Sequence, residues 1–226
     1  MFDLNTHTQH ITSGAALSAS GLPHRVRIPA DAGPHPTLIM LHGLDGNEDV
    51  TWIFARIASP DWLILTPRAP MITEGGFSWY PSTPPDRLPD SALFAAGSAA
   101  LDKFIDGALI TYPIDTRRVV LLGFSQGAAM SYTYAFRHRP ALIGLGALAG
   151  FIPPQIGAVP PLNALPILLL HGTEDERVPI SIARADQQRL LAAGAALQYE
   201  ESPIGHKVSA SGMRTLTAWL TARLTG

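Results

Sequence analysis

The residues best suited to chemistry form the pentapeptide Gly-Phe-Ser-Gln-Gly at positions 123–127. A serine between two such glycines is typical of a nucleophile elbow, in which a sharp turn from a strand into a helix exposes the serine hydroxyl above a sheet. An apolar run over 118–122 precedes the pentapeptide, and small residues with helical spacing follow it. This context favours Ser125 as a nucleophile over the alternative, an ordinary serine in a glycine-rich turn at the start of a helix.

A serine hydroxyl needs a histidine as general base and a carboxylate that orients this histidine. In enzymes built on such an elbow, the acid and then the base follow the serine along the chain. His138 lies at the far end of the helix that begins at the serine, about 20 Å away at 1.5 Å per residue. His171 ends an apolar run, where we expect it to pack under the following loop. His206 follows a short predicted strand over 197–201, so we predict that it is the base.

Three adjacent carboxylates, Glu174, Asp175 and Glu176, follow the apolar run over 166–170 and compete for the role of the acid. Their order along the chain does not separate them, because neighbouring side chains on an extended segment point in different directions. At most two of them face the site. We expect the others to be solvated and available to pair with Arg177.

Two backbone N–H groups are expected to stabilise the oxyanion of a tetrahedral intermediate. One belongs to Gln126, which follows the serine at the positive end of the next helix. The other is expected at Leu44, in the glycine-rich loop 42–47 that follows an early apolar run. The same loop lacks the lysine and the spacing of a phosphate-binding loop.

A scaffold of parallel strands must position these groups. Near-continuous apolar runs are typical of strands that are covered on both faces. Such runs alternate here with segments of helical spacing, which predicts a single α/β domain with a three-layer sandwich and a mostly parallel central sheet. We expect residues 23–226 to form this domain and residues 1–22 to be a leading strand or an extension. The predicted strands cover 26–28, 37–41, 62–65, 118–122, 142–148 and 166–170, and the predicted helices cover 49–58, 90–110, 126–137, 180–193 and 209–224, with Asp90 and Ser209 as N-caps.

The stretch 67–89 has no clear assignment, with six prolines and a Gly-Gly pair. Loops of this length in a compact domain are often functional. Its aromatic residues Phe77 and Trp79, together with Phe151 and Ile152 from a later segment, are candidates for an acyl-binding pocket. The alternative for all four is plain core packing.

Composition excludes several classes of function. The 226 residues contain 16 Lys and Arg and 18 Asp and Glu, for a formal net charge of -2. Without a basic cluster we expect neither nucleic acid nor an anionic membrane surface as a partner. The absence of cysteine excludes thiolate nucleophiles and disulfides and fits the reducing cytoplasm. The most apolar stretch, 141–152, is shorter than the roughly 20 residues that span a bilayer, and the N-terminus lacks the pattern of a signal peptide.

Seven motifs in order make the chain resemble the phospholipase/carboxylesterase family of α/β-hydrolases, which includes the acyl-protein thioesterases. They are Leu-His-Gly-Leu at 41–44, Pro-Arg-Ala-Pro at 67–70, Phe-Ser-Trp-Tyr at 77–80, the elbow at 123–127, Gly-Phe-Ile-Pro at 150–153, His-Gly at 171–172 with Asp175 and Val-Pro at 178–179, and Gly-His at 205–206. The resemblance implies a compact α/β-hydrolase fold with no separate lid domain. It also implies a serine hydrolase, monomeric or homodimeric, that cleaves small carboxylic esters or thioesters without a metal or cofactor.

The resemblance also selects the acid, because the family's catalytic aspartate stands three residues before the Val-Pro pair, which here is Asp175. Glu174 and Glu176 then become bystanders. Ser125 as nucleophile and His206 as base carry over in the same way, as do the N–H groups of Leu44 and Gln126. Loop 42–46 reads His-Gly-Leu-Asp-Gly where relatives often read His-Gly-Leu-Gly-Asp. The alternative from another class is a catalytically silent hydrolase fold that binds a small molecule.

Overall fold

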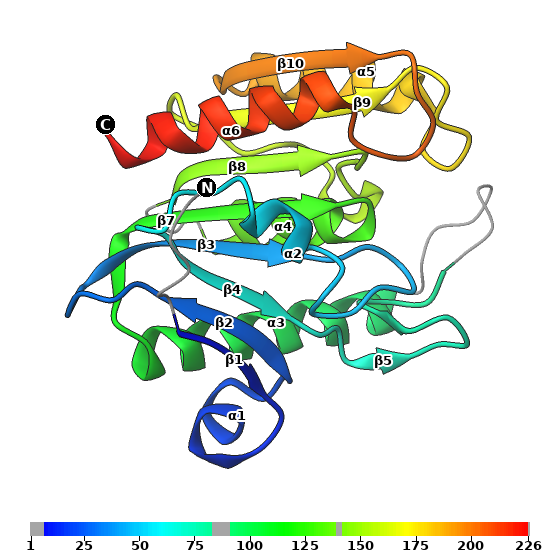
Figure 1. Cartoon of the computed structure of the whole chain (residues 1–226). Helices are drawn as coiled ribbons and strands as arrows, with labels where there is room; N and C mark the ends of the chain where they lie inside the picture. Colours follow the sequence, from blue (N-terminus) through cyan, green and yellow to red (C-terminus); the bar gives the residue numbers. More distant parts are fainter. Residues whose placement is uncertain (1–6, 83–90, 139–141, 226) are drawn as a thin grey trace.

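One eight-stranded sheet forms the centre of the protein, as seen in a computed structural model that describes residues 7–82, 91–138 and 142–225 (Figure 1). The strand order is β1-β2-β4-β3-β7-β8-β9-β10. Neighbours from β4 to β10 pair in parallel, and β1 and β2 pair antiparallel at one edge. The predicted α/β class with a mostly parallel sheet is confirmed.

Alternating strands and helices build this sheet. The strands of the sheet are β1 (His7–Ile11), β2 (His24–Ile28), β3 (His35–Leu41), β4 (Leu63–Pro67), β7 (Ile114–Phe124), β8 (Leu142–Leu148), β9 (Pro166–Gly172) and β10 (Ala196–Ser202). The helices are α1 (Gly14–Ser20), α2 (Trp52–Ala55), α3 (Ser91–Thr111), α4 (Gln126–His138), α5 (Ile180–Ala192) and α6 (Ala210–Leu224), with one short 3-10 turn at Pro154–Ile156. Across the described ranges, no helix is long and apolar enough to cross a membrane.

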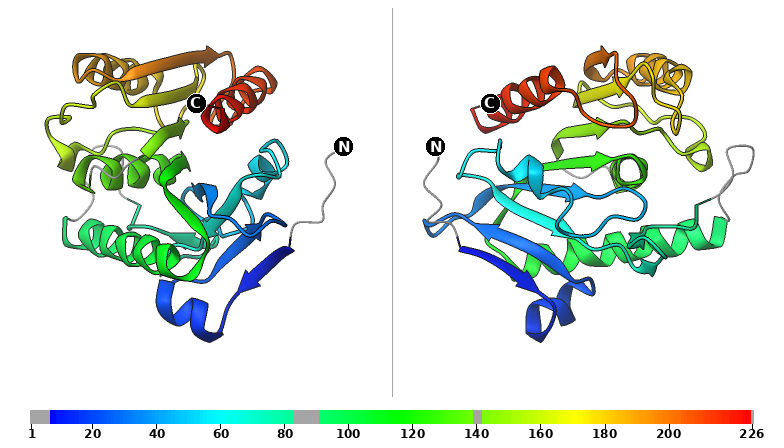
Figure 2. Two further views of the ribbon diagram at one scale, coloured as in Figure 1. Left: turned by 90° about the vertical axis from the view of Figure 1, so that its left-hand side faces the viewer. Right: turned by 45° about the vertical axis from the view of Figure 1, so that its right-hand side comes forward.

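Both faces of the sheet are covered by helices (Figure 2). Helices α1, α3, α4 and α5 lie on one face, and α2 and α6 lie on the other. Strand β3 shows why the apolar runs are continuous, since Ile39 and Leu41 pack towards α3 whereas Leu38 and Met40 pack towards α2 and α6. Successive side chains of a strand point to opposite faces, so a strand that is covered twice has no polar face.

The predicted boundaries differ from the structure mainly where polar turns interrupt an apolar pattern. The helix predicted over 49–58 is reduced to α2, because the backbone hydrogen bonds before and after it join residues three apart, from Trp52 to Asp49 and from Ile57 to Phe54, and form turns instead of α-helix. Ser209 caps α6 as predicted, with its Oγ accepting from the Gly212 N–H at 2.9 Å. The predicted cap Asp90 lies outside the described residues.

Part of the unassigned stretch is ordered as a small hairpin. Strands β5 (Met71–Ile72) and β6 (Phe77–Ser78) pair antiparallel, and the Phe77 N–H donates to the Gly46 carbonyl at 2.9 Å. The hairpin therefore contacts the loop that follows β3. Gly76 is required at this contact, because a Cβ there would lie 2.4 Å from the Asp45 carbonyl oxygen.

The described part of the N-terminal segment joins the edge of the sheet. Strand β1 pairs with β2, and α1 packs against α3. We propose that residues 23–226 form a single α/β domain and that residues 1–22 are a leading strand or an extension of it. The loops after β3, β7, β9 and β10 leave the sheet at one edge, because the carboxyl ends of parallel strands share an edge.

The packing of α6 on the sheet provides a test of this core. Leu216 is fully buried in α6, so Leu216→Ala should lower the free energy of unfolding by about 2–5 kcal/mol through lost burial and a residual cavity. Thr221→Ala, at an exposed position of the same helix, should change it by less than about 0.5 kcal/mol. Urea denaturation measures both, and similar losses at the two positions would contradict the placement of α6.

Candidate active site

Ser125 occupies the tight turn between β7 and α4. Its backbone has a φ of 53°, a left-handed conformation that side chains other than glycine rarely adopt. The Ser125 N–H donates to the Leu148 carbonyl of β8 at 2.9 Å, which ties the turn to the neighbouring strand. The hydroxyl is left partly exposed at the carboxyl edge of the sheet. Strained backbone of this kind is typical of a functional position.

The glycines on either side of Ser125 are required by close backbone packing. A Cβ on Gly127 would lie 2.1 Å from the Leu41 carbonyl oxygen at the end of β3. A Cβ on Gly123 would lie 2.3 Å from the Gly127 carbonyl carbon. Neither contact is possible for a real side chain, so β3, β7 and α4 can approach this closely only through glycine.

The side chains of Ser125, His206 and Asp175 meet in one hydrogen-bonded chain. His206 Nε2 lies 2.9 Å from Ser125 Oγ, and His206 Nδ1 lies 2.7 Å from Asp175 Oδ2. The three residues come from the loops after β7, β10 and β9. The ring of Phe124 packs against the imidazole with centroids 5.1 Å apart, which restricts its orientation.

Burial separates the three carboxylates that sequence spacing leaves equivalent. Asp175 is 5% exposed, whereas Glu174 and Glu176 are exposed to solvent. The second oxygen of Asp175 accepts from the N–H groups of Arg177 and Val178, each at 2.9 Å, so the carboxylate also shapes its own loop. The expected pairing of Glu174 or Glu176 with Arg177 is absent among the ion pairs of the described residues.

Of the other two late histidines, His171 contacts Asp175, with its Nε2 3.5 Å from Asp175 Oδ2, and His138 lies away from the site at the end of α4. His171 is buried, and its Nε2 bonds the Val178 carbonyl at 2.8 Å, as expected for a structural residue under the acid's loop. His138 bonds Asp102 of α3 at 2.9 Å on the protein surface.

Leu44 and Gln126 both lie next to Ser125, one on the loop after β3 and the other at the first position of α4. In the part of the chain that the structure describes, neither backbone N–H donates to a protein acceptor. Free amides at a helix start can bind an anion.

A cavity of about 320 Å³ opens beside Ser125 and His206. Its walls come mainly from the loop after β3, from α2 and from the end of β7. The apolar lining residues are Leu44, Val50, Ile53, Phe54 and Phe124, and the charged ones are Asp45 and Arg177. The side chains of Val50 and Ile53 are 52% and 55% exposed, which is unusual for large apolar residues and suits an apolar ligand.

The sequence model of the phospholipase/carboxylesterase family matches residues 24–224. The chain belongs to this family. The match covers nearly the whole chain and includes every motif on which the resemblance rests. As a member of the phospholipase/carboxylesterase family, the protein is a carboxylic ester hydrolase.

Individual proteins that are similar to this chain carry names consistent with this family. A probable carboxylesterase SOBER1-like protein of Arabidopsis thaliana is 28% identical over 211 residues, which are 83% of this chain and 78% of the relative. Acyl-protein thioesterase 1 homolog 1 of Dictyostelium discoideum is 32% identical over 162 residues, or 63% of this chain and 70% of the relative. The crystal structure of the Bacillus cereus carboxylesterase superposes with a TM-score of 0.82 at 21% identity and covers 92% of this chain and 97% of its own, which shows a shared fold.

In this family member, the four residues predicted for the acyl pocket do not line the cavity beside Ser125. Trp79 is fully buried, and its indole N–H donates to the His42 carbonyl at 3.0 Å. Ile152 is buried against α5, where its N–H donates to Asp186. Phe77 packs under the Arg68 guanidinium, and none of the four residues, Phe151 included, lines the cavity beside Ser125.

One residue that sequence reasoning missed, His42, and the side chain of Gln126, predicted only as a backbone donor, hold these loops together. His42 is fully buried, with its Nδ1–H donating to the Gly43 carbonyl at 2.7 Å and its Nε2 accepting from the Ala69 N–H at 2.9 Å. The Gln126 side chain accepts from the Trp79 N–H and donates to the Tyr80 carbonyl, each at 2.8 Å. The signal that the sequence offered for both is a polar residue that stands among small and apolar residues in a motif next to a buried strand.

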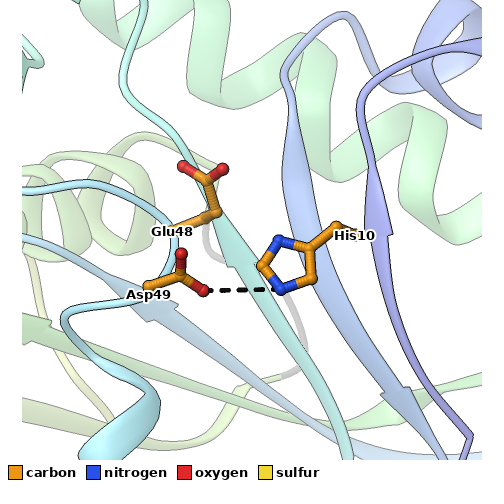
Figure 3. Close-up of side chains that lie close together, drawn as sticks. All are labelled: His10, Glu48 and Asp49. Carbon is orange, nitrogen blue, oxygen red and sulfur yellow. Dashed lines mark ion pairs between the residues drawn. The ribbon is translucent and has the colours of Figure 1, made fainter.

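A group of His10, Glu48 and Asp49 brings one histidine and two carboxylates close together (Figure 3). Their ligand atoms lie within 4.8 Å of one another, a spacing that a cation could use. Arg68 bonds Glu48, however, and Arg25 bonds Asp49 at 3.0 Å. The two negative charges are thus already balanced, and the group ties the edge strands β1 and β2 to the loop after β3.

Burial lowers the pKa of His42 to about 4, which makes its contribution to stability depend on pH. The unfolded chain binds this proton with an ordinary histidine pKa, so stability is complete above about 6.5 and is lost as the pH falls towards 4. The stability difference between wild type and His42→Asn should therefore shrink by about 3 kcal/mol between pH 7 and pH 4. Urea denaturation across this range tests it, with the half-exposed His10→Gln as control. A difference that stays constant with pH would contradict a neutral, buried His42.

Gln126 offers a second test because its side chain and its backbone have separate tasks. Gln126→Ala leaves the buried Trp79 N–H and Tyr80 carbonyl without this partner, which should cost about 2–4 kcal/mol in unfolding free energy. The backbone N–H of residue 126 remains, so the folded variant should keep much of its esterase activity. Activity lost as completely as after substitution of Ser125 would mean that the side chain itself takes part.

Proposed function

We propose that this protein cleaves carboxylic esters or thioesters through an acyl-enzyme on Ser125, with His206 as general base and Asp175 as the acid that orients it. The single observation that supports the proposal best is the bridging position of His206, whose two ring nitrogens lie 2.9 Å from Ser125 Oγ and 2.7 Å from Asp175 Oδ2. These distances are short enough for proton transfer between positioned groups.

The proposed reaction has two steps. His206 Nδ1–H donates to Asp175, which leaves Nε2 free to accept the proton of the Ser125 hydroxyl. Ser125 Oγ attacks the carbonyl carbon, and the oxyanion binds to the backbone N–H groups of Leu44 and Gln126. His206 then protonates the leaving alcohol or thiol as the carbon–oxygen or carbon–sulfur bond breaks. In the second step His206 activates a water molecule that hydrolyses the acyl-enzyme and releases the acid.

The carboxylate of Asp175 suits its proposed role because it is buried and fully engaged. One oxygen holds the imidazole, and the other accepts two backbone N–H groups of its own loop. It can therefore stabilise the positive charge that develops on His206 without rotating away. An exposed carboxylate such as Glu174 or Glu176 would be screened by water.

The cavity supports a small or medium-sized substrate with an apolar part. Val50, Ile53, Phe54 and Phe124 provide most of its apolar wall beside the proposed nucleophile. Relatives that carry the names carboxylesterase and acyl-protein thioesterase favour the same two classes of acyl substrate. Since the chain contains no cysteine, we also propose that it acts in the reducing cytoplasm.

A fluorophosphonate probe tests the proposed nucleophile. Such probes react with an activated serine, so wild type should be labelled at one site per chain and Ser125→Ala should not be labelled. The kcat for a p-nitrophenyl ester should fall by about 10⁴–10⁶ in the same variant. Ser18→Ala, at an exposed serine of α1, is the matched control and should be labelled like wild type. A wild-type protein that resists the probe would instead favour a catalytically silent binding module.

A further inference from the structure

Arg177 lines the cavity beside the proposed nucleophile, and the proposed mechanism does not use its side chain. It lies on the loop after β9, two residues beyond Asp175, and lines the cavity together with Ser125 and His206. Its backbone N–H donates to Asp175 Oδ1 at 2.9 Å. The carboxylate that is proposed to orient His206 therefore also fixes the backbone from which the exposed Arg177 side chain extends.

The guanidinium of Arg177 has no acceptor of its own within the described residues. Arg68 is bonded to Glu48, Arg184 to Glu201 and Arg189 to Asp186. In contrast, the structure shows neither an ion pair nor a side-chain hydrogen bond for Arg177 in the ranges that it describes, although Glu174 and Glu176 are close in sequence. Its five N–H donors are thus available to a molecule in the cavity.

The residues that line the cavity with Arg177 favour a negatively charged ligand at its guanidinium. The cavity wall near it is mostly apolar, and apolar walls strengthen an interaction between opposite charges relative to bulk water. The only carboxylate among the lining residues is Asp45, and the Thr73 hydroxyl donates to it at 2.6 Å, from the β5–β6 hairpin. A guanidinium presents a planar fork that matches the two oxygens of a carboxylate.

We propose that Arg177 is a specificity-determining residue that binds a carboxylate carried by the substrate, so that the enzyme prefers acidic esters over neutral esters of the same length. This inference rests on the proposed function, since it assigns the part of the substrate that lies away from the carbonyl. The Arg177 side chain is exposed, so the preference for acidic esters should weaken as the salt concentration rises.

Two matched pairs of esters test the proposal on either side of the scissile bond. The first pair is 4-nitrophenyl hydrogen adipate and 4-nitrophenyl methyl adipate, with the charge on the acyl part. The second pair is 3-acetoxybenzoate and its methyl ester, with the charge on the leaving group. For each pair the ratio of kcat/KM, acidic over neutral, is measured after subtraction of the uncatalysed rate, at low and at high salt.

At low salt, wild type should prefer the acidic member of at least one pair by about tenfold, and Arg177→Gln should bring that ratio close to one. Arg177→Lys keeps the charge but loses the planar fork, so its ratio should be intermediate. Arg214→Gln, at an exposed arginine of α6 away from the cavity, removes the same charge and should leave the ratio as in wild type.

The outcomes separate this inference from the proposed function. Cleavage of the neutral esters without any preference for the acidic ones, or a preference that persists in Arg177→Gln, would overturn the role of Arg177 and leave the serine mechanism standing. An equal loss of preference in Arg214→Gln would assign the effect to net charge and also overturn it. A wild-type enzyme that cleaves none of the four esters would count against both proposals.

Discussion

The close approach of three backbone segments around Ser125 is the constraint on which the rest of the site depends. Gly127 lies so near the Leu41 carbonyl that a single methyl group could not fit between them. This approach brings the end of β3 against the start of α4, so that Leu44, on the loop after β3, lines the same cavity as Ser125.

Buried polar side chains hold these segments together, and their burial costs little unfolding free energy because each has hydrogen-bond partners inside the protein. His42 joins the loop after β3 to the segment at Ala69, and Gln126 joins α4 to the backbone at Trp79 and Tyr80. A buried polar group without partners would destabilise the fold by about 1–3 kcal/mol, so such networks are favourable only when they are complete. The described part of the proline-rich stretch after β4 therefore holds the loop after β3 and the start of α4 in place through these hydrogen bonds. The cavity itself is lined mainly by the loop after β3 and by α2.

The scaffold and the turn that carries Ser125 could be predicted because their signals are local. Continuous apolar runs indicate strands covered on both faces, and the pentapeptide at 123–127 indicates the elbow without any knowledge of distant contacts. The pocket could not be predicted in the same way. Aromatic residues such as Trp79 are equally typical of a core and of an acyl pocket, and only the path of the backbone decides which side they face. The short helix α2 was predicted as a longer one, because the apolar pattern does not distinguish the turns on either side of it from a continuous helix.

The sequence by itself determined the class of fold and the family of this protein, and it indicated Ser125 and His206 as the proposed nucleophile and base, since residue type and order carry these signals. The tertiary structure decided which carboxylate is buried against His206. It also decided which apolar residues, among them Val50 and Ile53, line the cavity beside Ser125. It also left the guanidinium of Arg177 without an ion pair among the described residues, at the cavity that Ser125 and His206 line. These properties depend on distances between loops that are far apart in the chain, and such distances are set by how the strands pair and how the helices pack on them.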